Sequence, residues 1–248
     1  MSKNKSELIY GIHAVESALK HRGEDVLQLW VLQGRKDDRV NTLLELARKF
    51  GVSVQSISAD KMKKKCADAT HQGVAADLRV TSSKQFALED VLNKQGSLLL
   101  LILDEVQDPH NIGACLRTAD AAGVDAVIVS KNRSPGITPV VRKVACGAAD
   151  AVPFIQVSNL ARAMEQMRDH NIWIVGTAGE TDGSLYDISA SQRMALVMGA
   201  EGKGMRRLTR ENCDELVYIP MRGSVESLNV SVATGIALFE IRRKVDAA

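Results

Sequence analysis

Arg117 is the residue whose position in this sequence most strongly suggests chemistry. It lies in the stretch D-P-H-N-I-G-A-C-L-R-T-A-D-A-A-G, residues 108–123, and the residues one turn earlier, Gly113 and Ala114, are too small to cover it. Helical side chains lean toward the N-terminus, so its guanidinium would lie over the start of a helix, where backbone N–H groups favour anions. The pattern indicates a site for phosphate or an oxyanion. The alternative is a surface arginine paired with Asp120.

The helix that carries Arg117 is expected to begin at Asn111 and to end before Gly123. The Asn111 side chain can accept an orphan N–H of the first turn, and glycine readily takes the left-handed conformation that ends helices. Apolar residues recur at helical spacing, at Ile112, Cys115, Leu116, Ala119 and Ala122. The segment therefore predicts a helix with one buried face.

A second polar loop is M-G-A-E-G-K-G-M, residues 198–205, in which Glu201 lies among three glycines. Glycine at this density indicates backbone that turns sharply or lies close to another group. The spacing matches neither the dinucleotide-binding fingerprint nor a P-loop. The alternative is a flexible turn between a strand and a helix.

The third polar loop is I-P-M-R-G-S-V-E-S-L-N-V-S, residues 219–231. Pro220 ends a strand, and Ser227 can cap the last helix. Asn229 is a poor residue for a helix interior, so it is a candidate to face a ligand. The alternative is simple capping by Ser227, with Asn229 in solvent.

All three loops follow apolar, strand-like segments. Ligands in open parallel sheets bind outside the carboxyl ends of the strands. We therefore expect the three loops to converge on one pocket.

The chain alternates strand-like and helix-like segments, which indicates an α/β fold with mostly parallel strands. In the N-terminal part, helices are expected at 12–20, 40–50 and in a short basic segment, and strands at 26–32, 52–57 and 73–80. Residues 81–96 are more polar and predict a linker with one or two helical turns. Further strands are expected at 97–103, 126–129, 152–155, 172–177, 195–199 and 216–219.

The last helix, about 16 residues from Leu228, has two apolar stripes. One stripe is Leu228, Val232, Ile236 and Phe239, and the other is Val230, Ala233, Ala237 and Ile241. A helix that is apolar on two sides must be covered by more than one surface. We expect a subunit interface here; the alternative is burial in the core of one chain.

Composition is that of a soluble globular protein with one or two domains. Of 248 residues, 45% are hydrophobic and 25% charged, with a net charge of +2. Residues 1–78 carry 13 Lys and Arg against 10 Asp and Glu, whereas residues 96–248 carry 16 against 18. This difference slightly favours the N-terminal part as the side that faces nucleic acid. The run K-M-K-K-K, residues 61–65, could contact RNA phosphates or could be a solvated helix face.

The cysteines indicate whether the chain binds a metal, and the first residues indicate where in the cell it is located. The four cysteines are far apart and form no C-x-x-C pair, so we expect no metal site. The first residues, M-S-K-N-K-S-E, precede no apolar signal segment, and no run approaches the roughly 18 apolar residues of a membrane span. We expect a cytoplasmic protein without membrane contact.

Taken together, the three loops resemble the motif set of the knotted 2′-O-ribose methyltransferases, the TrmH-like branch of the SPOUT superfamily. The resemblance covers nearly all of the chain. In the N-terminal part, I-Y-G-I-H-A-V at 9–15 and H-Q-G-V at 71–74 are similar to the small substrate-binding domain found in part of this family. That domain looks like the ribosomal protein L30e fold.

The resemblance implies a domain order, a donor and a substrate. A small L30e-like α/β domain at 1–80 would bind RNA, 81–96 would be a linker, and 97–248 would form a SPOUT parallel-sheet domain with a C-terminal trefoil knot. The implied methyl donor is S-adenosyl-L-methionine. The implied partners are a second copy of the chain, with the active site near the subunit interface, and 23S ribosomal RNA methylated on a guanosine ribose. DNA is not expected, and tRNA guanosine 2′-O-methylation is the nearest alternative.

Carried over position by position, the resemblance also implies site residues. The implied active-site residues are Asn111, Arg117, Glu201, Ser227 and Asn229. The residues implied to bind the cofactor, largely through backbone groups, are Gly199, Ile219 and Leu228, with Thr177 as a weaker candidate. Glu105 and Glu226 stand where smaller residues are expected.

The chemistry leaves two roles open for Arg117. Attack by a ribose oxygen requires in-line positioning and a group that accepts its proton. The family role for Arg117 is that base, whereas the difficulty of deprotonating a guanidinium favours a charged clamp on the phosphate and the developing alkoxide. Glu201 would accept hydrogen bonds or fix Arg117. Ser227 and Asn229 would orient the cofactor or the nucleotide.

Two other classes of protein compete with an RNA methyltransferase. One is an RNA-binding assembly protein of the same shape that has lost catalysis. The other is an α/β enzyme with a nucleotide or dinucleotide cofactor, which the missing glycine fingerprints disfavour.

Overall fold

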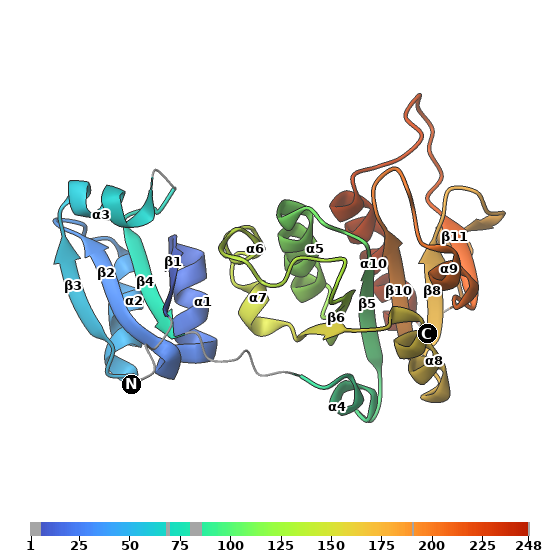
Figure 1. Ribbon diagram of the computed structural model, residues 1–248, viewed down its shortest axis with the longest axis horizontal. Helices are drawn as coiled ribbons and strands as arrows, with labels where there is room; N and C mark the ends of the chain where they lie inside the picture. The colour runs from blue at the N-terminus through green and yellow to red at the C-terminus, as the bar shows by residue number, and fades with distance from the viewer. Residues whose placement is uncertain (1–5, 68–69, 80–85, 190, 248) are drawn as a thin grey trace. The chain divides into compact units, whose positions relative to one another are not determined.

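The computed structural model describes residues 6–67, 70–79, 86–189 and 191–247. The chain forms two compact units (Figure 1). The smaller unit contains Met1–Gln85 together with Pro139–Ala151, and the larger contains Phe86–Thr138 and Val152–Ala248. Residues 81–85 of the predicted linker lie outside the described residues, and the rest of it contains one short helix.

The smaller unit is built on a sheet of strand order β1-β4-β2-β3. Strands β1 and β2 run antiparallel to β4, and β3 runs parallel to β2. Helices α1 and α2 cover one face and α3 lies against the other. The elements are β1 (Ser6–Tyr10), α1 (Ile12–Arg22), η1 (Gly23–Asp25), β2 (Val26–Leu32), α2 (Asp38–Lys49), β3 (Ser53–Ile57), α3 (Ala59–Cys66) and β4 (Val74–Arg79). The sequence predicts all of these except η1 and the short edge strand β1.

The segment 139–151 belongs by its contacts to the smaller unit, which the sequence did not predict. Its two short helices are α6 (Pro139–Ala145) and α7 (Ala148–Ala151). The Ser17 hydroxyl donates to the Gly147 carbonyl at 2.8 Å, and Arg142 donates to Asp150 at 2.5 Å. The first bond holds the segment against α1, and the second joins its two helices.

The larger unit is built on a seven-stranded sheet of order β7-β6-β5-β10-β8-β11-β9, in which every neighbouring pair is parallel. The elements of its first half are α4 (Leu88–Leu92), β5 (Leu98–Asp104), α5 (Pro109–Ala121), β6 (Ala126–Ser130), β7 (Phe154–Val157) and α8 (Leu160–Asp169). Those of the second half are β8 (Trp173–Thr177), β9 (Gly183–Ser184), η2 (Leu185–Asp187), β10 (Arg193–Gly199), α9 (Arg207–Glu211), β11 (Glu215–Tyr218) and α10 (Val230–Asp246). The predicted α/β fold with a parallel sheet is confirmed.

Strand β5 is an inner strand of this sheet, between β6 and β10, and all seven of its residues are buried. Leu98, Leu100 and Ile102 pack with α4 and α8 on one face of the sheet. Helices α5 and α10 pack against each other, side by side in Figure 1. Burial on both faces explains why β5 is a continuous apolar run rather than an alternating one.

The starts of α5 and α10 differ from the prediction. Asp108 caps α5, because its side chain accepts from His110 and Pro109 supplies a helical φ at the first position. Asn111 therefore lies inside the first turn and is not the cap. Helix α10 is capped by Asn229 and not by Ser227, because the Asn229 side chain accepts from the Ser231 N–H.

Among the described residues, no helix has the length and apolar character needed to cross a membrane.

Candidate active site

The candidate site lies at the carboxyl ends of three strands of the large sheet. Parallel neighbours end at the same edge, so the segments after β5 and β10 start side by side, where Asp104 pairs with Gly199. The third loop leaves β11 and returns to the start of α10. Figure 1 shows these connections at one end of the sheet.

Glu201 joins the three loops. Its Oε1 accepts hydrogen bonds from Asn111 Nδ2 at 3.3 Å, from Asn229 Nδ2 at 2.5 Å and from the backbone N–H of Val230 at 3.1 Å. The donors come from α5, from the third loop and from the first residue of α10. A carboxylate at a helix start also interacts favourably with the positive end of the helix dipole.

Asn229 uses both ends of its side-chain amide. The Nδ2 group donates to Asn111 Oδ1 at 2.9 Å as well as to Glu201. The Oδ1 accepts from the Ser231 N–H at 2.9 Å and from its hydroxyl at 2.5 Å. One residue thus caps α10 and links the other two loops.

The glycines shape the loop that carries Glu201. A Cβ on Gly199 would lie 2.3 Å from the carbonyl carbon of Gly204, so only glycine fits there. Ala200 and Gly204 exchange two backbone hydrogen bonds of 3.1 and 2.9 Å, and Gly202 and Gly204 have positive φ angles of 74° and 65°. The loop is therefore a closed turn with Glu201 near its tip.

The residues implied to hold the cofactor lie where backbone groups are available. Gly199 ends β10, Ile219 follows β11, and Leu228 precedes the cap of α10; all three are partly buried. From 220 to 228 the backbone forms no hydrogen bond with any residue that the structure describes. These donors and acceptors fit a ligand held by main-chain groups, as S-adenosylmethionine would be here. Thr177 instead donates its hydroxyl to the Val197 carbonyl at 3.2 Å, joining two strands.

The hydrogen bonds described for Glu201 and Asn229 involve neither Arg117 nor Ser227. Arg117 is exposed on α5, six residues after Asn111, which places the two side chains about 120° apart around the helix. Ser227 and Glu226 are exposed in the third loop. Within one chain the hydrogen bonds bring together Asn111, Glu201 and Asn229.

A buried polar pair lies between the two helices that carry Asn111 and Asn229. The sequence did not predict this pair. Cys115 Sγ lies 3.5 Å from Thr234 Oγ1, and both residues are fully buried between α5 and α10. Burial, with a smaller contribution from the Glu201 charge, raises the pKa of the Cys115 thiol to about 11. The only sequence signal was that Cys115 fell on the apolar stripe.

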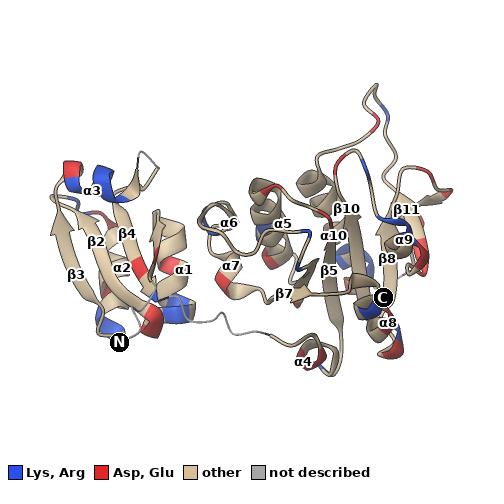
Figure 2. Ribbon diagram, viewed as in Figure 1, with Lys and Arg blue, Asp and Glu red and all other residues tan. Residues whose placement is uncertain are grey.

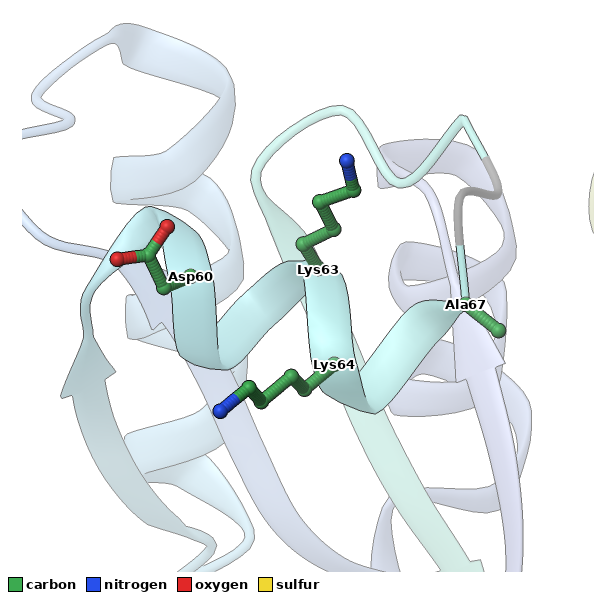
Figure 3. A pocket seen from close by; sticks show the side chains of 4 residues that line it. All are labelled: Asp60, Lys63, Lys64 and Ala67. Carbon is green, nitrogen blue, oxygen red and sulfur yellow. The ribbon is translucent and has the colours of Figure 1, made fainter.

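The basic helix α3 in the smaller unit divides into two kinds of lysine. Lys65 pairs with Asp77 at 3.1 Å, and its Nζ lies 4.2 Å from the ring centre of Trp30. Lys63 and Lys64 point away from each other and line a hollow of about 450 Å³ (Figure 3). Figure 2 shows basic residues along α3. Lys65 is held by its neighbours, so it is a weaker candidate for RNA contact than the exposed Lys64.

Comparison with known proteins identifies the two parts of the chain. A sequence model of the SpoU rRNA Methylase family matches residues 98–239, and one for RNA 2′-O ribose methyltransferase substrate binding matches residues 8–80. The chain belongs to the SpoU rRNA methylase family. This SpoU chain is thus a methyltransferase, and the predicted methyl donor, S-adenosylmethionine, is confirmed.

Relatives of this SpoU chain differ in how much of it they cover. The 23S rRNA (guanosine-2′-O-)-methyltransferase RlmB of Shewanella oneidensis is 54% identical over 243 residues, 97% of this chain and 98% of that protein. The AdoMet-bound rRNA methyltransferase of Sinorhizobium meliloti is 25% identical, with a TM-score of 0.79 over 96% of this chain and 87% of its own. The TrmH/SpoU tRNA modifying enzyme of A. aeolicus is 29% identical, with a TM-score of 0.57 over 64% of this chain and 81% of its own.

Proposed function

We propose that this protein transfers a methyl group from S-adenosylmethionine to the ribose 2′-oxygen of a guanosine in 23S ribosomal RNA. The observation that carries the proposal is the 54% identity to the Shewanella enzyme over 97% of the chain. The hydrogen bonds around Glu201 agree with it, because they join all three loops that carry the family motifs.

In this proposal, different residues of the site bind the donor and fix the start of α10. Bound S-adenosylmethionine supplies an electrophilic methyl group on a sulfonium. The backbone at Gly199, Ile219 and Leu228 holds the donor, and Glu201 fixes the amide of Asn229 at the start of α10. Such fixed donors act without reorganising during the reaction, which is the basis of electrostatic preorganisation.

A homodimer completes the site in this proposal. Val232 and Phe239 on α10 are each 52% exposed, although they form part of an apolar stripe. A second copy that covers this stripe would bury apolar surface that one chain leaves in water. It would also bring a second Arg117 from outside, either as proton acceptor or as a charged clamp on the RNA. Ser227, exposed in the third loop, would then orient the nucleotide or the donor.

The two family matches support a division of the chain into two domains. Residues 1–80 bind the RNA substrate, 81–96 link the domains, and 97–248 form the methyltransferase domain with its trefoil knot. The protein works in the cytoplasm, where ribosomal RNA is modified, without contact to DNA or membrane. Two candidate functions compete: methylation of a tRNA guanosine, and non-catalytic RNA binding during ribosome assembly.

Methyl transfer to defined RNAs tests the proposal. Radiolabelled S-adenosylmethionine is incubated with the protein and either unmodified 23S rRNA or unmodified tRNA, and the labelled nucleoside is then identified. We expect label in 2′-O-methylguanosine from 23S rRNA. Label in tRNA alone would support the tRNA function, and RNA binding without transfer would support the assembly protein.

The Arg117→Ala variant tests the site itself. Transfer should be lost while S-adenosylmethionine still binds, since neither role of Arg117 involves holding the donor. Near-normal turnover would exclude both the base and the clamp.

A further inference from the structure

A fully buried carboxylate at the edge of the site is not used by any step above. Asp104 is the last residue of β5 and is 0% exposed. It lies opposite Gly199 in the parallel register of β5 and β10, where the glycine-rich loop begins. Burying a carboxylate costs folding free energy unless it is paired and hydrogen-bonded. The partners of Asp104 therefore indicate its role.

Both oxygens of Asp104 bind the same residue at the other end of that loop. Oδ2 accepts from the backbone N–H of Arg206 at 2.8 Å, and Oδ1 accepts from Arg206 Nε at 2.8 Å. Arg206 immediately precedes α9. The loop that carries Glu201 is thus fixed at its start by strand pairing and at its end by a charged, two-point contact.

Glu105 extends this contact to a further loop. It forms ion pairs with Arg133, which follows β6, and with Arg206 at 3.5 Å. Its φ angle is +61°, a conformation that non-glycine residues rarely adopt. The four charged residues, Asp104, Glu105, Arg133 and Arg206, connect the segments that follow β5, β6 and β10. Glu105, which stood out in the sequence as unexpectedly large, has partners for its charge here.

We propose that Asp104, acting through Arg206, is a positioning residue that holds the glycine-rich loop in the shape that binds the methyl donor. Without this contact the loop would be held by the Ala200–Gly204 hydrogen bonds and by those of Glu201, and its far end would be less fixed. The proposal rests on the proposed function, because it assigns the loop to S-adenosylmethionine. It implies a loss of donor affinity and no loss of RNA affinity.

Two variants and a matched control separate positioning from general stability. Arg206→Ala removes the Nε contact and keeps the backbone bond, and Asp104→Asn places an amide where a carboxylate accepted two bonds. The control is Arg207→Ala, because Arg207 is the neighbouring arginine and pairs only locally with Glu211 at 2.6 Å. Arg206→Ala keeps the proposal testable if Asp104→Asn does not fold.

The measurements are the dissociation constant for S-adenosylmethionine by calorimetry, that for 23S rRNA fragments by filter binding, and amide hydrogen exchange of the free protein. Arg206→Ala should weaken donor binding at least tenfold, change RNA binding less than twofold, and speed exchange at the Ala200 and Gly204 amides. Arg207→Ala should change none of these.

Folded Arg206→Ala protein with wild-type donor affinity and wild-type exchange in the loop would overturn the inference. It would leave the proposed function intact if the same protein still methylated 23S rRNA. Wild-type protein that did not bind S-adenosylmethionine would overturn both. The exchange measurement needs no ligand, so it tests the loop contact by itself.

Discussion

The side-chain amide of Asn229 donates to the carboxylate of Glu201 across 2.5 Å, so the cap of helix α10 is also the partner of the acidic residue in the glycine-rich loop. The oxygen of the same amide accepts from the N–H of Ser231, the second residue of the helix. The stability of the helix start and the geometry of the site therefore depend on one side chain.

Replacing Asn229 by Asp separates these two roles. Aspartate caps helices as well as asparagine does, but it would place a second carboxylate beside Glu201. One of the two carboxyl groups would have a raised pKa and would be neutral at low pH. The variant should therefore approach wild-type thermal stability near pH 5 and lose stability as the pH rises through that raised pKa. Unfolding midpoints measured from pH 5 to pH 8 check this.

The control for that series is Asn229→Ser, which keeps a capping oxygen and adds no charge. Its difference from wild type should not change with pH. An Asn229→Asp variant with the same pH profile as the serine variant would show that the two carboxyl groups do not interact.

Gly199→Ala should abolish methyl transfer. The added Cβ would lie 2.3 Å from the Gly204 backbone, and no flexible side chain can move to relieve the overlap. Opening the loop would remove Glu201 from its three donors. Gly179→Ala is the matched control, because a Cβ there meets nothing within 4 Å. Single-turnover transfer and donor affinity are the measurements, and normal donor affinity in Gly199→Ala would contradict the tight closure of the loop.

Alkylation should distinguish the cysteines. Burial raises the pKa of the Cys115 thiol to about 11 and that of the Cys213 thiol to about 12, so neither forms thiolate at pH 8 in the folded protein. Cys146 is exposed. Iodoacetamide at pH 8 followed by peptide mass spectrometry should label Cys146 first. Labelling of Cys115 at the same rate would show that α5 and α10 separate readily.

The lysines of α3 should differ in what they support. Lys65→Ala removes a cation–π contact and an ion pair, so it should lower the stability of the smaller unit by about 1 kcal/mol. Replacing Lys63 and Lys64 by Ala should reduce the salt dependence of RNA binding. Thermal unfolding and salt titrations of RNA binding check the two effects. An unchanged salt slope in the double variant would assign these lysines to solubility.

Most strands could be predicted from the sequence, because buried strands consist of continuous runs of apolar residues. Residues 97–103 and 126–129 correspond closely to β5 and β6. Helix starts were less accurate: Asn111 looked like a cap, but Pro109 lets α5 begin earlier with Asp108 as its cap. Edge strand β1 was missed because five residues carry little pattern, and its partner β4 lies more than sixty residues away.

Only part of the candidate site could be predicted from the sequence, because some of its contacts form between segments far apart in the chain. The family motifs placed Asn111, Glu201 and Asn229 in the site, and the structure joins them by hydrogen bonds. The role of Asp104 could not be predicted, because its contact with Arg206 exists only when β10 inserts beside β5. A carboxylate that ends a continuous apolar run was the only signal.

The closed turn that follows β10 also limits how the chain can vary in length. Ala200 and Gly204 pair across it, and Arg206 is held two residues later, so an extra residue anywhere between them would break at least one of these bonds. The segment around Gly179 is closed less tightly, because Arg210 donates to the Glu180 carbonyl and the Thr181 hydroxyl donates to the Leu216 carbonyl, both through side chains. A change of length is therefore better tolerated at Gly179 than between Ala200 and Arg206, where it would move Glu201.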